Sequence, residues 1–258
     1  MAKQSTAQEG QGGQGRVEID ADAQVDRVKS DLAAAIRAAA LYGFHEGIDN
    51  HFSISIPGRS DLFLVNRFGP HWSQITTGDI VTVDLDGRVV DGEGELAVTA
   101  LMIHRACHQA RPAARAVFHG HMPYSTAVAI TVDGLDTRLS QNATYFHNRL
   151  VRLPYGGAAH TAEEGERIAS AVANGATAVL LDNHGALVIG DDVASAWHRL
   201  YFLEQAARVQ VLAQSTGREL IRMTEAMAAH AAAQWDEDAN APTALFAAVK
   251  RQLGWTDV

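Results

Sequence analysis

The sequence contains very little cysteine, because Cys107 is the only one in 258 residues. An intrachain disulfide is therefore impossible, and a disulfide scaffold built in an oxidising compartment is excluded. Basic residues are also scarce: 21 lysines and arginines stand against 30 acidic residues, with a formal net charge of -9 at pH 7. A protein that neutralises phosphates needs clustered lysine and arginine, so we expect no nucleic-acid partner.

Long apolar segments are missing as well. No stretch approaches the roughly 18 consecutive apolar residues of a membrane-spanning helix, and residues 1–15 lack the apolar core of a signal peptide. We therefore expect a cytoplasmic protein without a membrane partner. Residues 1–20 are mostly polar and rich in Gln and Gly, which predicts a disordered tail. Residues 21–258 are the single expected domain, since a hydrophobic content of 47% can form a sizeable core.

Helical and strand patterns alternate along the chain. Apolar residues recur at helical spacing from Asp22 to Gly43, and strict alternation predicts a strand at residues 52–56 that ends at Pro57. Further strands are expected at residues 62–65, 80–84 and 88–90 and before His119 and His184, and further helices at residues 99–110, 161–173, 191–216, 224–234 and 243–253. The last two helices are expected to cap the domain. The pattern indicates an α/β protein with a partly antiparallel sheet.

Two histidines follow the apolar run Ala116-Val117-Phe118, in the motif His119-Gly120-His121. Side chains two residues apart on an extended strand point to the same face, so both imidazoles can reach one cation. The alternative is a pair of ordinary surface or core histidines.

A third candidate ligand is His184, which also ends an apolar run, in Asn183-His184-Gly185. If the two runs are strands that end at the same edge of a sheet, three neutral imidazoles converge there and leave an open position for substrate or water. Since Asn and Gly are common turn residues, the motif is equally consistent with a simple turn.

These motifs, taken together, resemble the class II aldolase and adducin family. The resemblance spans roughly residues 26–217 and rests on residues 49–53 (Asp-Asn-His-Phe-Ser), the spacer 111–117, residues 119–124 (His-Gly-His-Met-Pro-Tyr) and residues 183–185. It implies a three-layer α/β/α domain around a largely antiparallel or mixed sheet, commonly assembled as homotetramers with sites at subunit junctions. It also implies one divalent metal per chain, usually zinc and sometimes manganese or iron, held by His119, His121 and His184.

The chain departs from the sugar-phosphate aldolases of that family at the catalytic glutamate. Their Pro-Ser-Ser-Glu element corresponds to residues 97–100, so that Ala100 stands at the glutamate position. Alanine cannot move a proton, and the ordinary retro-aldol mechanism is not supported. Glu93 or Glu95 could substitute only if the preceding loop were shifted.

The family's phosphate-binding turn also differs, because residues 65–69 read Val-Asn-Arg-Phe-Gly here. Loss of hydroxyl donors argues against a sugar phosphate, and the planar guanidinium of Arg67 suits a carboxylate. We expect Arg67, Asn50 and Thr99 to bind the substrate. Expected catalytic residues are His71, as an acid or base, and Tyr124 or Tyr145, as a proton donor, and the same cleft is expected to hold Asn142 and His147. His45, His51 and His104 are interpreted as structural.

The sequence thus predicts a metal-dependent carbon–carbon lyase for a small, non-phosphorylated, oxygenated carboxylic acid. Decarboxylation is favoured over aldol cleavage, because it needs no base to deprotonate a hydroxyl and tolerates alanine at position 100. Three alternatives remain open: a non-haem iron oxygenase, a dehydratase on the same three histidines, and a non-catalytic interaction domain like the adducin head.

Overall fold

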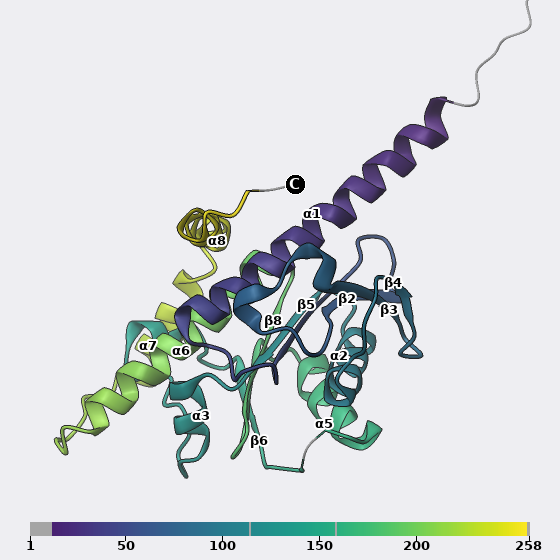
Figure 1. The fold of residues 1–258 in the computed structure, drawn as a ribbon. Coiled ribbons are helices and arrows are strands. Elements are labelled where there is room, and N and C mark those ends of the chain that lie inside the picture. Colours follow the sequence, from purple (N-terminus) through teal and green to yellow (C-terminus); the bar gives the residue numbers. More distant parts are fainter. Residues whose placement is uncertain (1–11, 114, 158, 257–258) are drawn as a thin grey trace, which may run out of the picture.

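The computed structural model describes residues 12–113, 115–157 and 159–256. Within these residues, eight strands form one sheet in the order β4-β3-β2-β1-β5-β8-β7-β6 (Figure 1). Neighbouring strands are antiparallel, except that β6 runs parallel to β7 among the described strands. The strands are β1 (His51–Ser55), β2 (Leu62–Asn66), β3 (Ile80–Asp84), β4 (Val89–Asp91), β5 (Ala116–Gly120), β6 (Leu150–Leu153), β7 (Ala178–Leu181) and β8 (Gly185–Gly190).

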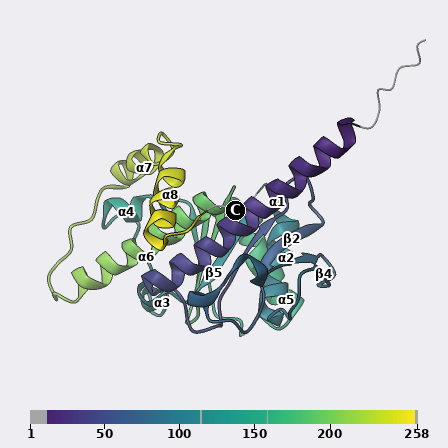
Figure 2. The same cartoon turned by 45° about the horizontal axis from the view of Figure 1, so that its top comes forward.

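Helices cover both faces of the sheet. The helices α2 and α5 pack together against one face, and α1, α3 and α6 lie on the other (Figures 1 and 2). The expected three-layer α/β/α architecture with a mixed sheet is confirmed. The helices are α1 (Gly12–Tyr42), α2 (Val98–Ala110), α3 (Pro123–Ala129), α4 (Gln141–Thr144), α5 (Ala162–Ala173), α6 (Val193–Gln214), α7 (Glu225–Gln234) and α8 (Ala241–Leu253), with short 3₁₀ turns η1 (Trp72–Gln74) and η2 (Thr77–Asp79).

Each face of the sheet has its own hydrophobic core, because successive side chains of a strand point to opposite faces. On β5, Ala116 and Phe118 pack with α1 and α6, and Val117 packs with α2 and α5. On β1, Phe52 stacks on Phe118 with ring centroids 4.0 Å apart. The other face of β1, toward α2, carries polar side chains. His119 lies two residues after Val117 on β5 and opposite His51 on β1, so its side chain also lies on the α2 side of the sheet.

The first helix begins earlier than the sequence pattern predicts. The apolar spacing predicts a start at Asp22 and a disordered tail up to residue 20, whereas α1 begins at Gly12. Residues 1–11 of the expected tail lie outside the described residues. An established helix gains one backbone hydrogen bond per added residue, and the chain has no proline before Pro57, so the helix can extend upstream of the apolar pattern to Gly12.

Short elements were also missed by the sequence pattern. The strand β8 is buried on both faces, so it shows no alternation of apolar and polar residues. The helices α3 and α4 and the strand β6 are too short to show a period.

The predicted C-terminal helices are present: α8 packs on α1 and α6, where Lys250 Nζ donates to Asp31 at 2.7 Å. Among the described residues, no helix is long and apolar enough to cross a membrane.

Candidate metal centre

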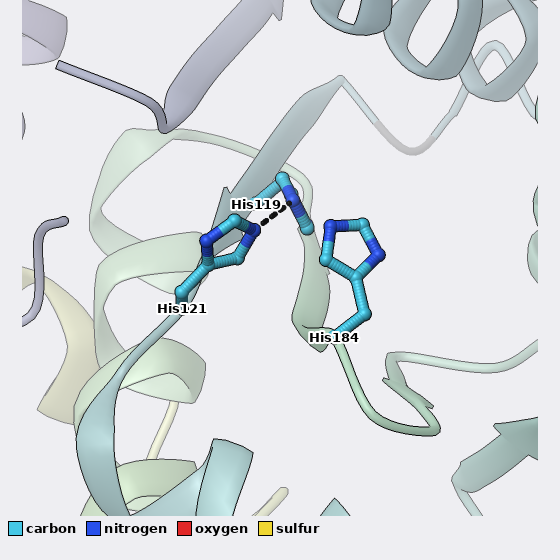
Figure 3. Close-up of side chains that lie close together, drawn as sticks. All are labelled: His119, His121 and His184. Atoms are coloured by element: carbon cyan, nitrogen blue, oxygen red, sulfur yellow. Dashed lines mark hydrogen bonds between the residues drawn. The ribbon is translucent and has the colours of Figure 1, made fainter. Parts of the chain in front are cut away.

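Three histidines converge at one edge of the central sheet (Figure 3). The strands β5 and β7 both run antiparallel to β8, which lies between them, so their carboxyl ends meet at the same edge. His119 and His121 come from the end of β5, and His184 lies in the turn that joins β7 to β8. Asn183 adopts a left-handed conformation in this turn (φ 57°), which asparagine tolerates better than most residues. Residues 183–185 therefore form a turn, and this turn places the His184 ring beside His119 and His121.

The three imidazoles have the spacing of a metal site. One ring nitrogen from each lies within 4.8 Å of the others, and the ring centroids are 4.8 to 5.0 Å apart. His119 Nε2 lies 3.2 Å from His121 Nε2 (Figure 3). Since zinc binds histidine nitrogen at about 2.0–2.1 Å, nitrogens that close together can share one ion.

The outer nitrogens of two rings have fixed partners. His119 Nδ1 lies 3.0 Å from the carbonyl oxygen of Ala186, which can only accept, so Nδ1 carries the proton. His121 Nδ1 donates in the same way to the carboxylate of Glu46. Both Nε2 atoms then direct bare lone pairs at each other across 3.2 Å, an arrangement that a cation between them would stabilise.

Burial keeps His119 and His184 in the neutral form that binds metals. Removal from water lowers the pKa of His119 well below the ordinary value, and neighbouring histidines add to this effect. Burial also lowers the pKa of His184, to about 4, again with a contribution from His121. A neutral imidazole offers a lone pair without first losing a proton, so the donor set fits a divalent ion such as zinc.

The histidines open into a cavity of about 280 Å³. Of the residues expected to bind substrate, Asn50 and Thr99 line it, and so does Ala100, which the resemblance aligns with the family's glutamate. Among its described lining residues there is no lysine or arginine; the only charged side chains are the carboxylates Glu46 and Asp49. The full lining is Glu46, Ile48, Asp49, Asn50, His51, Asn66, Phe68, Ala97, Thr99, Ala100, Ile103, His119, His121, Ala159 and His184.

Several other predicted site residues lie away from this cavity wall. The Arg67 guanidinium pairs with Asp79, with Nε 2.8 Å from Oδ1. His71 caps the start of the η1 turn, where its Nδ1 contacts the Ser73 hydroxyl at 2.7 Å. Glu93 and Glu95 are exposed and are not among the described residues that line the cavity.

The two candidate tyrosines also pack elsewhere. Tyr124 lies in the first turn of α3, where the Arg208 guanidinium lies 5.7 Å from its ring centroid and its backbone N–H donates to Glu204 at 2.8 Å. Tyr145 is buried in an aromatic cluster, stacked on Trp235 with centroids 4.7 Å apart, and burial raises the pKa of its phenol. Of the remaining cleft candidates, His147 lines a separate cavity with Glu225, and Asn142 is not among the residues that line the metal cavity.

Sequence reasoning missed three residues at the site. Glu46 contacts His121 from the loop after α1, and its backbone N–H donates to Asn50 Oδ1 at 2.9 Å. His51, interpreted as structural, lines the cavity and lies directly opposite His119 on the neighbouring strand, with ring centroids 4.9 Å apart. Tyr155 lies near His184, with ring centroids 6.2 Å apart. Glu46 lies just before the motif at residues 49–53, and His51 lies within it, so the motif could have pointed to both. Nothing in the sequence distinguishes Tyr155.

Comparison with known proteins places the chain in a family. Residues 30–211 match the model for the class II aldolase and adducin N-terminal domain. A class 2 aldolase protein from Caulobacter vibrioides is 37% identical over 194 residues, which cover 75% of each chain. The decarboxylase NovR from Streptomyces niveus is 30% identical over 190 residues (72% of this chain and 69% of NovR). A 4-hydroxy-3-prenylphenylpyruvate oxygenase/4-hydroxy-3-prenylbenzoate synthase from Streptomyces roseochromogenus is 32% identical over 189 residues (72% and 67%).

Solved structures agree with this assignment. An aldolase II superfamily protein from Pseudomonas syringae superimposes with a TM-score of 0.83 at 34% identity, covering 91% of this chain and 95% of its own. An L-fuculose 1-phosphate aldolase from Glaciozyma antarctica gives a TM-score of 0.79 at 26% identity (98% and 95%). Matching sequence, fold and three convergent histidines lead to one conclusion: this chain belongs to the class II aldolase and adducin family.

Proposed function

We propose that this protein is a divalent-metal-dependent carbon–carbon lyase that acts on a small, non-phosphorylated carboxylic acid, with decarboxylation favoured over aldol cleavage. The observation that carries the proposal is the cavity wall itself: three convergent imidazoles face a position where the family's glutamate is replaced by Ala100. Cleavage chemistry that requires a carboxylate at that position is unavailable, whereas loss of carbon dioxide does not require one.

His119, His121 and His184 would hold the metal ion. When bound there, a divalent ion supplies Lewis acidity, which polarises substrate oxygens and stabilises the negative charge left when a carbon–carbon bond breaks. Glu46 and the Ala186 carbonyl orient two of the rings through their outer nitrogens. Open space beside the rings, lined by Asn50 and Thr99, would receive the substrate.

The charge of the cavity supports a substrate of low negative charge. A phosphate dianion would face Glu46 and Asp49 and would find no lysine or arginine among the described lining residues. A carboxylate carries a single charge that the metal could neutralise directly. The Thr99 hydroxyl and the His51 ring are the nearby neutral donors, with Oγ1 and Nε2 3.4 Å apart. Arg67, the carboxylate partner expected from the sequence, pairs with Asp79 instead.

The names of the relatives include decarboxylation, oxygenation and aldol cleavage, the reactions weighed here. Two Streptomyces relatives carry the names decarboxylase and oxygenase/synthase, and one solved relative is named for cleavage of a sugar phosphate. A non-haem iron oxygenase is the second candidate, because three histidines with open positions can also bind iron. A dehydratase is a further alternative, and an adducin-like interaction domain is the least favoured one. A homotetramer and a cytoplasmic location remain predictions.

The proposal can be tested by turnover with defined metals. The protein is stripped of metal, reloaded separately with Zn²⁺, Mn²⁺ or Fe²⁺, and given a panel of keto and hydroxyaromatic acids, with L-fuculose 1-phosphate alongside. We expect carbon dioxide release from an acid without oxygen uptake, lost in His121→Ala and kept in His230→Ala, which changes an exposed histidine on α7. Oxygen uptake that depends on Fe²⁺ would favour the oxygenase, and activity with the sugar phosphate alone would refute the proposal.

A further inference from the structure

The face of β1 that packs on α2 carries polar side chains where a buried strand usually carries apolar ones. His51, Ser53 and Ser55 alternate along the strand and point to the same face. His104 and His108, four residues apart on one face of α2, lie against them. All five side chains are buried.

These five residues form one continuous hydrogen-bonded chain. His51 Nδ1 lies 2.7 Å from His104 Nε2, and His104 Nδ1 bonds to the Ser53 hydroxyl. The same hydroxyl lies 2.8 Å from His108 Nε2, and His108 Nδ1 lies 3.0 Å from the Ser55 hydroxyl. Both ring nitrogens of His104 and His108 are therefore engaged, each with a different member of the chain.

The two ends of the chain open into different cavities. His51 lines the metal-site cavity and stacks near His119. Ser55 and His108 line a second cavity of about 280 Å³ at the other end of β1, together with Arg59 and Arg115. The chain thus crosses the domain interior between two places where solvent or a small molecule can enter.

A purely structural role accounts poorly for this arrangement. Replacing a buried polar network by well-packed apolar residues is often neutral or stabilising, so stability alone does not require five polar side chains here. Burial also lowers the pKa of His104 well below the ordinary value, and that of His108 to about 3. These two rings are then neutral, with one donor and one acceptor nitrogen each, as a proton-conducting chain requires.

We propose that His51, His104, Ser53, His108 and Ser55 form a proton relay between the second cavity and the metal-site cavity. A water in the second cavity gives a proton to the Ser55 oxygen as the Ser55 proton passes to His108 Nδ1, and the hydroxide left behind takes a proton from bulk solvent. The Nε2 proton of His108 moves to Ser53, whose own proton passes to His104 Nδ1. The Nε2 proton of His104 moves to His51 Nδ1, and the Nε2 proton of His51 passes to a water in the metal-site cavity. One proton enters, one leaves, and every ring ends neutral in its other tautomer.

One end of the relay reaches the cavity in which Ala100 takes the place of the family's glutamate. Ala100, at the family's glutamate position, cannot carry a proton, and it shares the metal-site cavity with His51. A relay that ends at His51 supplies protons from solvent without a carboxylic acid at position 100. This inference goes beyond the lyase proposal and does not depend on it, because proton exchange along the chain can be measured without any substrate.

The test measures exchange of the His104 ring N–H with solvent, by NMR on full-length protein labelled with ¹⁵N-histidine and held in one metal state throughout. His104 has no exposed surface, so its proton exchanges through the relay or through local opening of the fold. Ser53→Ala removes the hydroxyl that joins the two α2 histidines. His108→Gln keeps a polar side chain of similar size but cannot change tautomer, and it provides the same test if Ser53→Ala does not fold.

We expect both variants to slow His104 exchange by about a hundredfold, the lower end of what one positioned proton-transfer group contributes. The matched control is Ser30→Ala, which removes a buried hydroxyl that accepts from the Trp255 indole at 3.0 Å and lies outside the relay. This control should leave the exchange rate unchanged. A purely structural network predicts faster exchange of the His104 ring N–H in both relay variants, since loss of a hydrogen bond loosens the packing. Unchanged or faster exchange in a folded Ser53→Ala or His108→Gln variant would overturn the relay, whatever the turnover assay shows.

Discussion

Gly185 is the residue at which a single added carbon would damage the metal site without removing a ligand. It follows His184 at the start of β8, and its φ is not in the left-handed region, so alanine can adopt the backbone conformation. A Cβ at this position would lie 2.7 Å from the Gly120 carbonyl oxygen and 2.7 Å from Cδ2 of His121. Both contacts are about 0.7 Å shorter than the 3.4 Å at which ordinary contact begins.

The size of the effect follows from what can move. The Gly120 oxygen belongs to the strand paired with β8 and cannot give way without shifting the sheet, so we expect Gly185→Ala to destabilise the fold by about 1–3 kcal/mol. The His121 ring would have to move by several tenths of an ångström, more than the ~0.2 Å tolerance of a metal–ligand distance. We expect zinc affinity to fall by about tenfold or more.

The matched control is Gly120→Ala, on the neighbouring strand at the same edge. There the nearest atom to an added Cβ is the Phe44 carbonyl oxygen at 3.4 Å, an ordinary contact. Urea denaturation gives the free energy of unfolding, and competition with a chromophoric chelator gives the zinc dissociation constant. If Gly185→Ala behaves like Gly120→Ala in both measurements, the close packing of β8 against His121 described here is wrong.

Three further changes test other parts of the account. Glu46→Gln should weaken zinc binding by about 10–100-fold, because the amide is a poorer partner for the His121 Nδ1 proton, and chelator competition that shows no change would contradict this contact. The pKa of His108 is about 3 in the folded protein against an ordinary 6.5, so the folded state binds fewer protons and stability falls as the pH drops below 6.5. Between pH 6.5 and 4.5 the free energy of unfolding of the wild type should fall by about 2–3 kcal/mol more than that of His108→Gln, since the difference grows by about 1.4 kcal/mol per pH unit. Parallel stability curves for the two proteins would refute this. Glu204→Gln should cost about 1–3 kcal/mol in urea denaturation, because one oxygen replaces the two that accept from the N–H groups of Tyr124 and Ser125 at 2.8 Å; wild-type stability would contradict it.

The convergence of His119, His121 and His184 could be predicted from the sequence because its signals are local. Alternation places His119 and His121 on one face of a strand, and an apolar run ending in His184 indicates a second strand end at the same edge. The three-layer fold follows from the alternating helices and strands together with the family resemblance. These features depend on residues close together in the chain or on motifs with fixed spacing.

The rest of the site depends on pairings across the chain that no local pattern reveals. Arg67 was expected to face the substrate, but a carboxylate twelve residues later, Asp79, pairs with it. His51 and His104 were each interpreted as structural, without reference to the other. Only the packing of α2 on β1 brings His51 Nδ1 to 2.7 Å from His104 Nε2. The contact of Glu46 with His121 spans 75 residues, so it too depends on the folded chain.

The central claim is that His119, His121 and His184 together hold one divalent metal ion. The most direct test is elemental analysis of untagged protein purified without chelator, beside His184→Ala and the exposed-histidine control His230→Ala. The account predicts about one divalent ion per chain in the wild type and in His230→Ala, and a loss of most of it in His184→Ala. No bound metal in the wild type even after reconstitution, or equal metal content in all three proteins, would contradict it.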